Sequence, residues 1–471
     1  MKVEQLFTSC LAEMAYYIES NGEVAIIDPL RETEPYIEMA KADGAKIKYV
    51  FLTHFHADFV SGQVDLAKKT GATIVFGPNA NPNYEIHKGK DGEEFKIGKV
   101  TLKLLHTPGH TMESSSYLLI DENGNKPYVF TGDCLFIGDV GRPDLAVKSD
   151  LTQEDLAGYL FDSLRNKIMI LPDDIVVYPN HGAGSACGKN MSSETFDSLG
   201  NQKKTNYALR ADMTKSAFIK EVTTGLKPAP QYFGNNVRMN KGVNTSIDEV
   251  INRGTTPIDA ITFKEMSERD DILVIDTRSK DEYTNEGTIP GAWYIGVDGS
   301  FAPWVGSLIT NINQKIIFIA EGGREHEVVT RFSRVGYDNI LGFLRGGIHA
   351  WLAAGFQVDK IGSISATQFA NKLKEGSDCI ALDVRKESEY LSEHVVGVEN
   401  FPLDFIHSNF AEIKPDKEYV LHCASGYRSL IAASIFQANG IKNVTDVRGG
   451  FKDIKDTSVE RTAYVCPTTL L

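Results

Sequence analysis

The sequence lacks several features that would mark a specialised class of protein. It has 471 residues but only six cysteines, and its 49 basic residues are outnumbered by 63 acidic ones, which gives a formal net charge of −14. So few cysteines in so long a chain do not make a disulfide framework, and scattered thiols are typical of a reducing cytoplasm, where we expect this protein. The acidic balance argues against a nucleic-acid partner, which requires clustered Lys and Arg.

Long apolar runs are also missing. No stretch approaches the roughly 18–20 residues that a membrane-spanning helix needs. Residues 1–7 lack the apolar segment and small-residue cleavage site of a secretory signal. We therefore expect no membrane partner, and the length predicts two to four domains at roughly 100–200 residues each.

Short apolar runs alternate with helix-compatible segments over about the first 230 residues, which indicates an α/β layer architecture. The strand-like runs are Val24–Ile27, Tyr49–Leu52, Thr73–Phe76, Val100–Leu105, Ser116–Ile120, Tyr128–Phe130 and Ile175–Tyr178. Helices are expected around Glu34–Asp43 and Val64–Lys69. From about Gln231 to Thr256 the chain is polar and rich in Gly and Asn, which predicts a linker or surface segment.

The rest of the chain contains an internal repeat. Ile272–Arg278 reappears as Cys379–Arg385, Arg324 corresponds to Arg428, and Leu344–Gly347 returns as Val447–Gly450, at offsets of 103–107 residues. Two copies of a small α/β domain, each with a largely parallel sheet and helices on both faces, explain this spacing.

Histidines and carboxylates recur where the first region's predicted strands end. His54, His56 and Asp58 form an H-x-H-x-D pattern after one strand, and His110, Asp133 and His181 follow later ones. Loops at such strand ends are where α/β layers place ligands. The ordered series predicts a metal site.

These residues resemble the signature of the metallo-β-lactamase superfamily, T-H-x-H-x-D-H with later His, Asp and His positions. The resemblance implies an αβ/βα sandwich with the metal at one edge. Binuclear hydrolases of the superfamily, such as glyoxalase II, bind a second metal through the last His of the signature. Phe59 stands there in this chain and cannot bind a metal.

The persulfide dioxygenase branch of the superfamily binds one iron, and by position its ligands are His54, His110 and Asp133. This resemblance implies one Fe(II) per chain, held by two imidazoles and one carboxylate that leave open positions for O2 and a thiolate. His56, Asp58 and His181 then orient ligands or relay protons, or form a residual second metal site.

Three further residues lie in the loops near this predicted site. Arg142 matches an arginine of the dioxygenases and is expected to hold either its loop or a substrate carboxylate. Cys187, in a Gly-rich loop similar to one in dioxygenases fused to rhodanese domains, is expected to admit substrate or relay sulfur, or to be an incidental thiol. Cys134 is interpreted as a packing residue.

Cys423 opens a tight loop between a predicted strand and helix, in the pattern C-x-x-G-x-R that ends at Arg428. Backbone N–H groups and the positive helix end stabilise a thiolate in such a loop. The loop is shorter than that of a tyrosine phosphatase, so it suits sulfur rather than phosphate. It resembles the rhodanese sulfurtransferases, which implies that Cys423 carries the sulfur and Arg428 is its electrostatic partner.

The first copy of the repeat has no cysteine, so it cannot form the covalent persulfide and resembles an inactive rhodanese that acts as a spacer or docking module. The expected domains are a metallo-β-lactamase-like persulfide dioxygenase over residues 1–235, a linker over 236–257, an inactive rhodanese over 258–358, an active one over 363–461 and a tail over 462–471.

These resemblances imply a persulfide dioxygenase coupled to sulfur transfer for sulfide detoxification. Its partners would be a low-molecular-weight thiol persulfide, O2, and sulfite or thiosulfate, and we expect a homo-oligomer. The alternative is a glyoxalase II-like zinc thioesterase with the rhodanese copies as docking modules.

Overall fold

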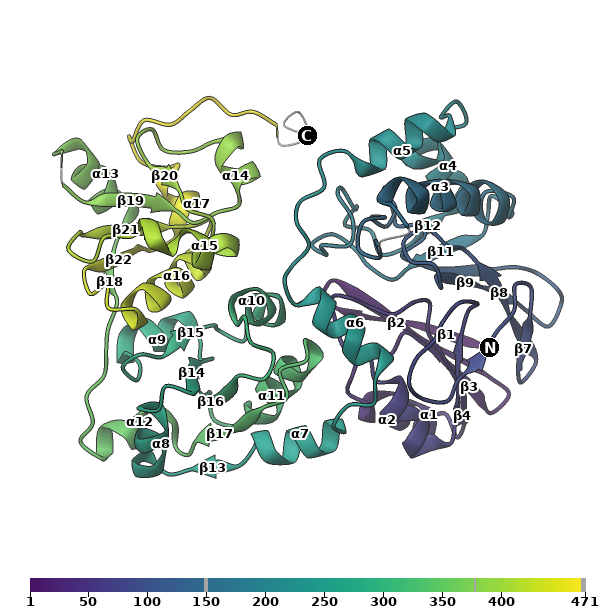
Figure 1. Ribbon diagram of the computed structural model, residues 1–471, viewed down its shortest axis with the longest axis horizontal. Coiled ribbons are helices and arrows are strands. Elements are labelled where there is room, and N and C mark those ends of the chain that lie inside the picture. Colours follow the sequence, from purple (N-terminus) through teal and green to yellow (C-terminus); the bar gives the residue numbers. More distant parts are fainter. Residues whose placement is uncertain (148–150, 377, 467–471) are drawn as a thin grey trace. The chain divides into compact units, whose positions relative to one another are not determined.

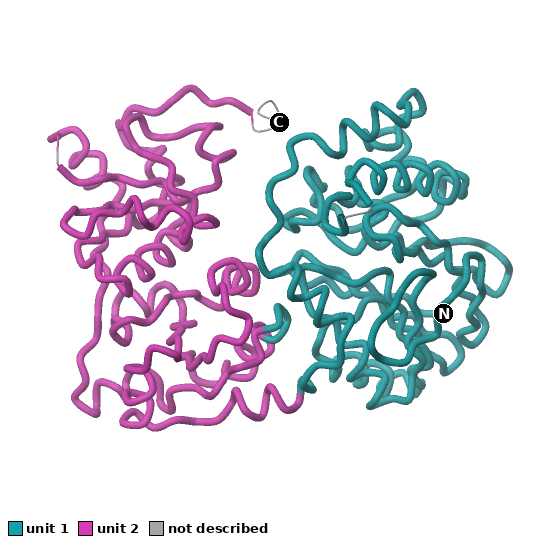
Figure 2. Tube along the Cα trace, viewed as in Figure 1, with its two compact units in different colours: residues 1–247, 333–336 teal, residues 248–332, 337–471 magenta. Residues whose placement is uncertain are grey.

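The computed structural model describes residues 1–147, 151–376 and 378–466, so residues 467–471 of the expected tail lie outside the described residues. The chain divides into two compact units (Figure 2). The first comprises residues 1–247 with 333–336, and the second residues 248–332 with 337–471. No helix in the described ranges combines the length and the apolar character needed to span a bilayer.

The first unit contains two six-stranded sheets (Figure 1). One has the order β1(Lys2–Thr8), β2(Glu13–Ser20), β3(Glu23–Ile27), β4(Lys46–Phe51), β5(Thr73–Phe76), β6(His87–Lys88). The other has the order β12(Asp197–Ser198), β11(Val176–Pro179), β10(Tyr128–Gly132), β9(Ser115–Ile120), β8(Val100–His106), β7(Glu94–Ile97).

Apolar side chains of both sheets meet in one core. Tyr16 and Phe51 of the first sheet pack in the same cluster as Leu102 and Phe130 of the second. The opposite face of the first sheet, with Tyr17 of β2, packs against helices instead. Strand β2 is therefore buried on both faces, which explains its nearly continuous apolar sequence.

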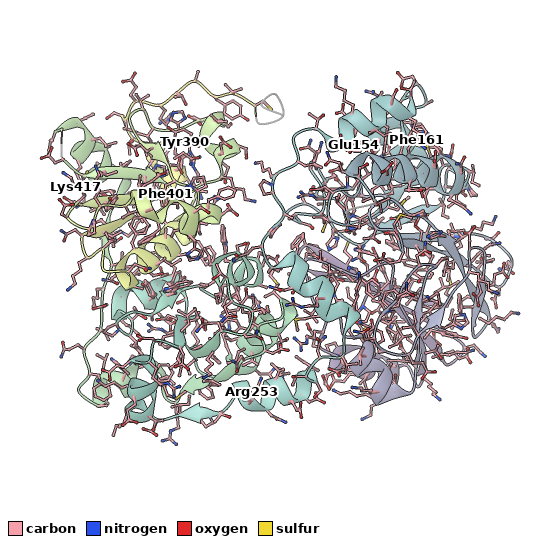
Figure 3. The ribbon with its side chains drawn as sticks, in the orientation of Figure 1. Glu154, Phe161, Arg253, Tyr390, Phe401 and Lys417 are labelled. Atoms are coloured by element: carbon pink, nitrogen blue, oxygen red, sulfur yellow. The ribbon has the colours of Figure 1, made fainter. Side chains whose placement is uncertain are left out.

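Helices cover the outer face of each sheet. Helices α1(Glu34–Ala42) and α2(Gln63–Thr70) pack on the first sheet. Helices α3(Gln153–Ser163), α4(Leu199–Thr205) and α5(Lys215–Thr223) pack on the second, where Phe161, labelled in Figure 3, meets Phe218 edge-on at a centroid distance of 5.4 Å. The order helix, sheet, sheet, helix confirms the predicted αβ/βα sandwich.

The segment predicted to be a linker, residues 236–257, contains the boundary between the two units after Ile247 and is helical for much of its length. Helix α6(Phe233–Lys241) ends inside it, and α7(Ile247–Gly254) follows. Asn236 and Asn240 of α6 are buried. Asn240 donates to the backbone of His56 and Phe59, so a buried amide stands where a helix usually buries an apolar side chain, and the usual helical pattern of apolar residues is missing.

The second unit contains two five-stranded parallel sheets of the same topology. The first copy has the order β13(Pro257–Ile258), β17(Ile340–Leu344), β16(Lys315–Ile319), β14(Ile272–Asp276), β15(Trp293–Tyr294). The second copy has β18(Gly362–Ile364), β22(Val444–Val447), β21(Tyr419–His422), β19(Ile380–Asp383), β20(Glu399–Asn400). The shared strand order confirms the repeat.

Helices flank both sheets of the second unit (Figure 1). Those of the first copy are α8(Ala260–Ser267), α9(Lys280–Glu286), α10(Phe301–Leu308), α11(Glu325–Arg334) and α12(Gly347–Ala353). Those of the second are α13(Ala366–Lys374), α14(Glu387–Ser392), α15(Ile406–Asn409), α16(Tyr427–Ala438) and α17(Gly450–Ile454).

Candidate metal centre and thiol loop

Three side chains from loops of different strands converge at one edge of the sandwich. His54 follows β4, His110 follows β8, and Asp133 follows β10. The Nε2 atoms of His54 and His110 lie 3.7 and 3.4 Å from Oδ2 of Asp133, and all three residues are about 2% exposed. The structure thus brings together the three residues predicted as ligands.

Neighbouring groups determine which ring nitrogen carries the proton in each of these histidines. Nδ1 of His110 lies 2.9 Å from the carbonyl oxygen of Arg142, which can only accept, so Nδ1 donates. Nδ1 of His54 lies 2.9 Å from Oγ1 of Thr53, whose own proton goes to Oδ2 of Asp28. Both Nε2 atoms therefore direct a lone pair toward Asp133.

This donor set fits a metal ion. Two imidazole lone pairs and a carboxylate oxygen face one another, and Oδ2 of Asp133 accepts no hydrogen bond from any described residue. Burial, together with the adjacent His56, holds the pKa of His54 well below its ordinary value, so the ring is neutral as a ligand must be. The three ligand atoms lie within 4.8 Å of one another, close enough for His54, His110 and Asp133 to share one ion.

A second buried cluster adjoins the first and consists of Asp58, His181 and Cys187. His181 lies between two carboxylates, with Nδ1 2.8 Å from Asp133 and Nε2 2.8 Å from Asp58. Burial opposes a charge on its ring, but Asp133 and Asp58 outweigh burial and raise the pKa of His181 well above its ordinary value. His181 therefore orients Asp133 in this structure.

The two cysteines of this unit that the sequence singled out are both buried thiols. Burial raises the pKa of Cys187 well above its ordinary value and that of Cys134 to about 12. Cys134 packs in the apolar cluster between the second sheet and its helices. Cys187 faces Asp58 and His181, so of the two only Cys187 borders the metal centre.

His56 does not join the three converging ligands. Its Nε2 lies 3.0 Å from Oδ1 of Asp28, and its ring stacks on Phe59 at a centroid distance of 4.3 Å. Phe59 is fully buried. An apolar ring thus occupies the position where the binuclear hydrolases have a ligand.

Sequence reasoning missed two residues that support this loop. Asp28, fully buried, accepts from the backbone and hydroxyl of Thr53 and binds His56. Asn240 of α6 donates to the carbonyl oxygens of His56 and Phe59. Asp28 directly follows β3 and could have been found as another acidic residue at a strand end, whereas Asn240 gives no such signal.

Arg142 supports the site through its backbone, while its guanidinium holds loops. The side chain forms two hydrogen bonds with Asp144, at 2.7 and 2.6 Å. It also donates to the carbonyl oxygens of Ala186 and Lys227. Of the two roles expected for Arg142, these contacts support the structural one.

Cys423 lies where predicted, between β21 and α16, and is 1% exposed. The backbone N–H of Gly426 donates to its sulfur at 3.1 Å, and the hydroxyl of Ser429 lies 3.5 Å from it. Gly426 has φ of +94°, a conformation that favours glycine and turns its N–H toward the sulfur. The loop therefore surrounds the sulfur of Cys423 with hydrogen-bond donors, an arrangement called here the sulfur cradle.

Arg428, the predicted electrostatic partner of Cys423, forms its side-chain hydrogen bonds with a carboxylate of the same copy. The guanidinium forms two hydrogen bonds with Glu389, at 2.6 and 2.9 Å. Burial lowers the pKa of Arg428, but Glu389 and, more weakly, Cys423 raise it above its ordinary value. Arg428 therefore anchors the loop to α14 and shares its charge between Glu389 and the sulfur.

The first copy has an alanine at the corresponding position. Strand pairing sets Asp276 opposite Ile319 and, in the second copy, Asp383 opposite His422, so Ala320 corresponds to Cys423. Glu321, next in that loop, lies 3.3 Å from Arg324. An anionic side chain thus occupies the loop where the second copy places its sulfur cradle.

Comparison with known proteins agrees with the division of the chain into an N-terminal sandwich and two copies of a smaller domain. The profile of the metallo-beta-lactamase superfamily matches residues 9–181, and that of the rhodanese-like domain matches residues 259–354 and 365–457. A metallo-beta-lactamase from Staphylococcus aureus is 31% identical, with a TM-score of 0.63, over 73% of this chain and 98% of that one.

Two curated relatives match the N-terminal region. A probable hydroxyacylglutathione hydrolase of Schizosaccharomyces pombe is 33% identical over 198 residues, which cover 41% of this chain and 72% of the relative. The human mitochondrial persulfide dioxygenase ETHE1 is 30% identical over 183 residues, which cover 38% of this chain and 67% of the relative. The chain therefore belongs to the metallo-β-lactamase superfamily, as an enzyme whose His/Asp metal-site domain is followed by two rhodanese-like domains.

Proposed function

We propose that this enzyme is an iron-dependent persulfide dioxygenase coupled to a sulfurtransferase. The first domain would oxidise the outer sulfur of a low-molecular-weight thiol persulfide: RSSH, O2 and H2O give RSH, sulfite and two protons. O2 is reduced by four electrons and the outer sulfur loses four. The last domain would then transfer sulfur through Cys423.

The observation that carries the proposal is the convergence of His54, His110 and Asp133 beside an apolar residue at the position of the second-metal ligand. His54, His110 and Asp133 supply three donor atoms, while Phe59 offers none and His181 is held between two carboxylates. Two imidazoles and a carboxylate are the donors that non-haem Fe(II) takes in oxygenases, where the ion provides open positions for O2 and a thiolate. The similarity to human persulfide dioxygenase supports the same assignment.

The chain's own residues would prepare this site. Thr53 and the carbonyl oxygen of Arg142 hold the two histidines in the tautomer that presents Nε2. His181 can hold a proton between Asp58 and Asp133, close to where protons are released. The burial of all these groups keeps water from competing with the substrate.

Cys423 would carry sulfur between two acceptors. Its thiolate attacks the outer sulfur of RSSH, RSH leaves, and a persulfide remains on Cys423. Sulfite then attacks the outer sulfur of that persulfide, which yields thiosulfate and returns the thiolate. The N–H of Gly426 and the start of α16 stabilise the sulfur anion at both stages.

One observation favours a second function, a zinc thioesterase of the hydroxyacylglutathione hydrolase type. Asp58, His181 and Cys187 have ligand atoms within 4.8 Å of one another and could hold a second metal if His181 lost its proton. The Schizosaccharomyces pombe relative supports this reading. In a thioesterase of this kind, Cys423 would take part in no reaction.

Two substrates separate the proposals. The iron-loaded protein is given glutathione persulfide in an oxygen electrode, and the zinc-loaded protein is given S-lactoylglutathione. We expect O2 uptake with sulfite or thiosulfate as product, and no thioester hydrolysis. Hydrolysis without O2 uptake would refute the dioxygenase proposal. Asp133→Asn, which removes a proposed ligand, should abolish O2 uptake; Asp43→Asn is its matched control, because Asp43 lies at the surface beside Lys2 and should leave both readouts unchanged.

A further inference from the structure

The first copy of the repeat packs against the start of α16, next to the Cys423 loop. Tyr427, at the start of α16, donates from its hydroxyl to the carbonyl oxygen of Gly296 at 2.8 Å. Its ring lies against Gly299, where a Cβ atom would come within 2.2 Å of it. The backbone N–H of Tyr294 also donates to Ser434 of α16 at 2.9 Å. The copy without a cysteine therefore holds the residue that follows Gly426.

The first copy also places a lysine close to the Cys423 loop. The ammonium group of Lys280, the first residue of α9, lies 4.0 Å from the point that a Cβ on Gly426 would occupy. Gly426 is the residue whose N–H binds the sulfur of Cys423. Across residues 1–147, 151–376 and 378–466, no side chain forms an ion pair or hydrogen bond with this ammonium group.

Helix stability does not account for a lysine at this position. A cation at the first position of a helix opposes the helix dipole, and an acidic residue is preferred there. The second copy has Glu387 at the equivalent position of α14. The helix of the first copy thus carries the less favourable charge at the point nearest to the sulfur loop.

Sulfur transfer at Cys423 is helped by more positive charge than Arg428, which shares its charge with Glu389, supplies alone. Sulfite and thiosulfate are dianions, and both must approach an anionic sulfur. Arg428 forms hydrogen bonds with Glu389 at 2.6 and 2.9 Å. Lys280 at the edge of the loop, which has no ion pair or hydrogen bond to a described side chain and whose charge acts on the carboxyl group of Asp446, reduces the repulsion between the two anions.

We propose that Lys280 of the first copy is a substrate-positioning residue of the Cys423 site and holds the oxyanion of sulfite or thiosulfate. The copy without a cysteine then completes the binding site of its neighbour. In the step that Lys280 assists, sulfite attacks the outer sulfur of the Cys423 persulfide, the bond between the two sulfurs breaks, and the electron pair remains on Cys423. This inference rests on the proposed sulfur transfer at Cys423.

The full-length protein is tested with thiosulfate as sulfur donor and cyanide as acceptor. We expect Lys280→Gln to raise KM for thiosulfate about fivefold while kcat changes less than twofold, as one charge contact at a partly solvated site predicts. Lys280→Arg should restore the wild-type KM. Lys264→Gln is the matched control, since Lys264 is an exposed lysine of the same copy, paired with Glu268 on α8.

A second readout does not depend on sulfur transfer. The rates at which iodoacetate, an anion, and neutral iodoacetamide alkylate Cys423 are compared by mass spectrometry, with the exposed Cys466 as internal reference. Lys280→Gln should lower the iodoacetate-to-iodoacetamide ratio at Cys423 and leave it unchanged at Cys466.

The outcomes separate the two proposals. An unchanged KM and an unchanged alkylation ratio in Lys280→Gln, or equal changes in Lys264→Gln, would overturn the role of Lys280. A wild-type protein that transfers no sulfur but shows the lysine-dependent ratio would refute the proposed function of Cys423 and leave the anion site standing.

Discussion

Replacing Thr53 with valine removes one hydroxyl group from behind His54 with almost no change in side-chain volume. That hydroxyl donates to Asp28 at 2.8 Å and lies 2.9 Å from Nδ1 of His54. Without it, Nδ1 loses its acceptor and the proton can move to Nε2, the atom that faces Asp133. The substitution should therefore weaken metal binding without touching a ligand.

The magnitude follows from the group left without a partner. Nδ1 of His54 is buried, and an unsatisfied buried polar group costs about 1–3 kcal/mol, whereas Oδ2 of Asp28 still accepts from the amide of Asn180. Loss of a hydrogen bond that orients a metal-bound histidine typically reduces metal affinity about 10–100-fold. We expect a decrease of this size for Fe(II).

Anaerobic competition against a fluorescent chelator measures the affinity of the variant and of wild type for Fe(II). Thr53→Ser keeps the hydroxyl and should bind Fe(II) about as tightly as wild type. A Thr53→Val protein that folds normally and retains wild-type affinity would refute the argument that Thr53 sets the tautomer of His54.

Three further variants test other parts of the molecule. Cys423→Ser should lower the number of persulfide molecules consumed per O2 from two to one and change the product from thiosulfate to sulfite. Ion chromatography of the products, together with an oxygen electrode, measures both changes. Continued thiosulfate formation would exclude Cys423 as the sulfur carrier. Asp133→Asn should abolish O2 uptake and lower bound iron by at least about tenfold, and elemental analysis that finds normal iron would show that Asp133 is not a ligand. Burial raises the pKa of Asp446 to about 7, while an unfolded aspartic acid titrates near 3.9. Between about pH 4 and 7 the native state holds a proton that the unfolded state has released, so the second unit should lose stability as pH rises through this range. Asp446→Asn should make the urea midpoint of the second unit nearly independent of pH between 5 and 8. An equal pH dependence in wild type and variant would contradict the assignment of this effect to Asp446.

Local sequence pattern predicted much of the fold because buried strands appear in the sequence as short apolar runs. The runs at Val24–Ile27 and Thr73–Phe76 are strands in the structure. The repeat predicted two copies of one domain, and their sheets share one strand order. The helices within residues 236–257 were not predicted because α6 buries asparagines, and the backbone partner of Asn240 lies far away in the sequence.

The residues of the candidate metal centre were predictable because metal binding limits the residue types and places them at strand ends. The groups that orient them were not. Asp28 lies 25 residues before Thr53, and Asn240 lies 184 residues after His56. Arg428 has a motif position that suggests a partner for Cys423, but only the tertiary structure brings Glu389 to its guanidinium. Pairings of this kind depend on the packing of separate elements rather than on local pattern.

The central claim is that His54, His110 and Asp133 hold a single redox-active ion. Its most direct measurement is elemental analysis of protein purified without oxygen and titrated with Fe(II), with the rate of persulfide-dependent O2 uptake followed at each loading. We predict that the rate rises with iron and reaches its maximum at one iron per chain. A protein that carries two zinc ions per chain and is inactive at every iron loading would contradict the account.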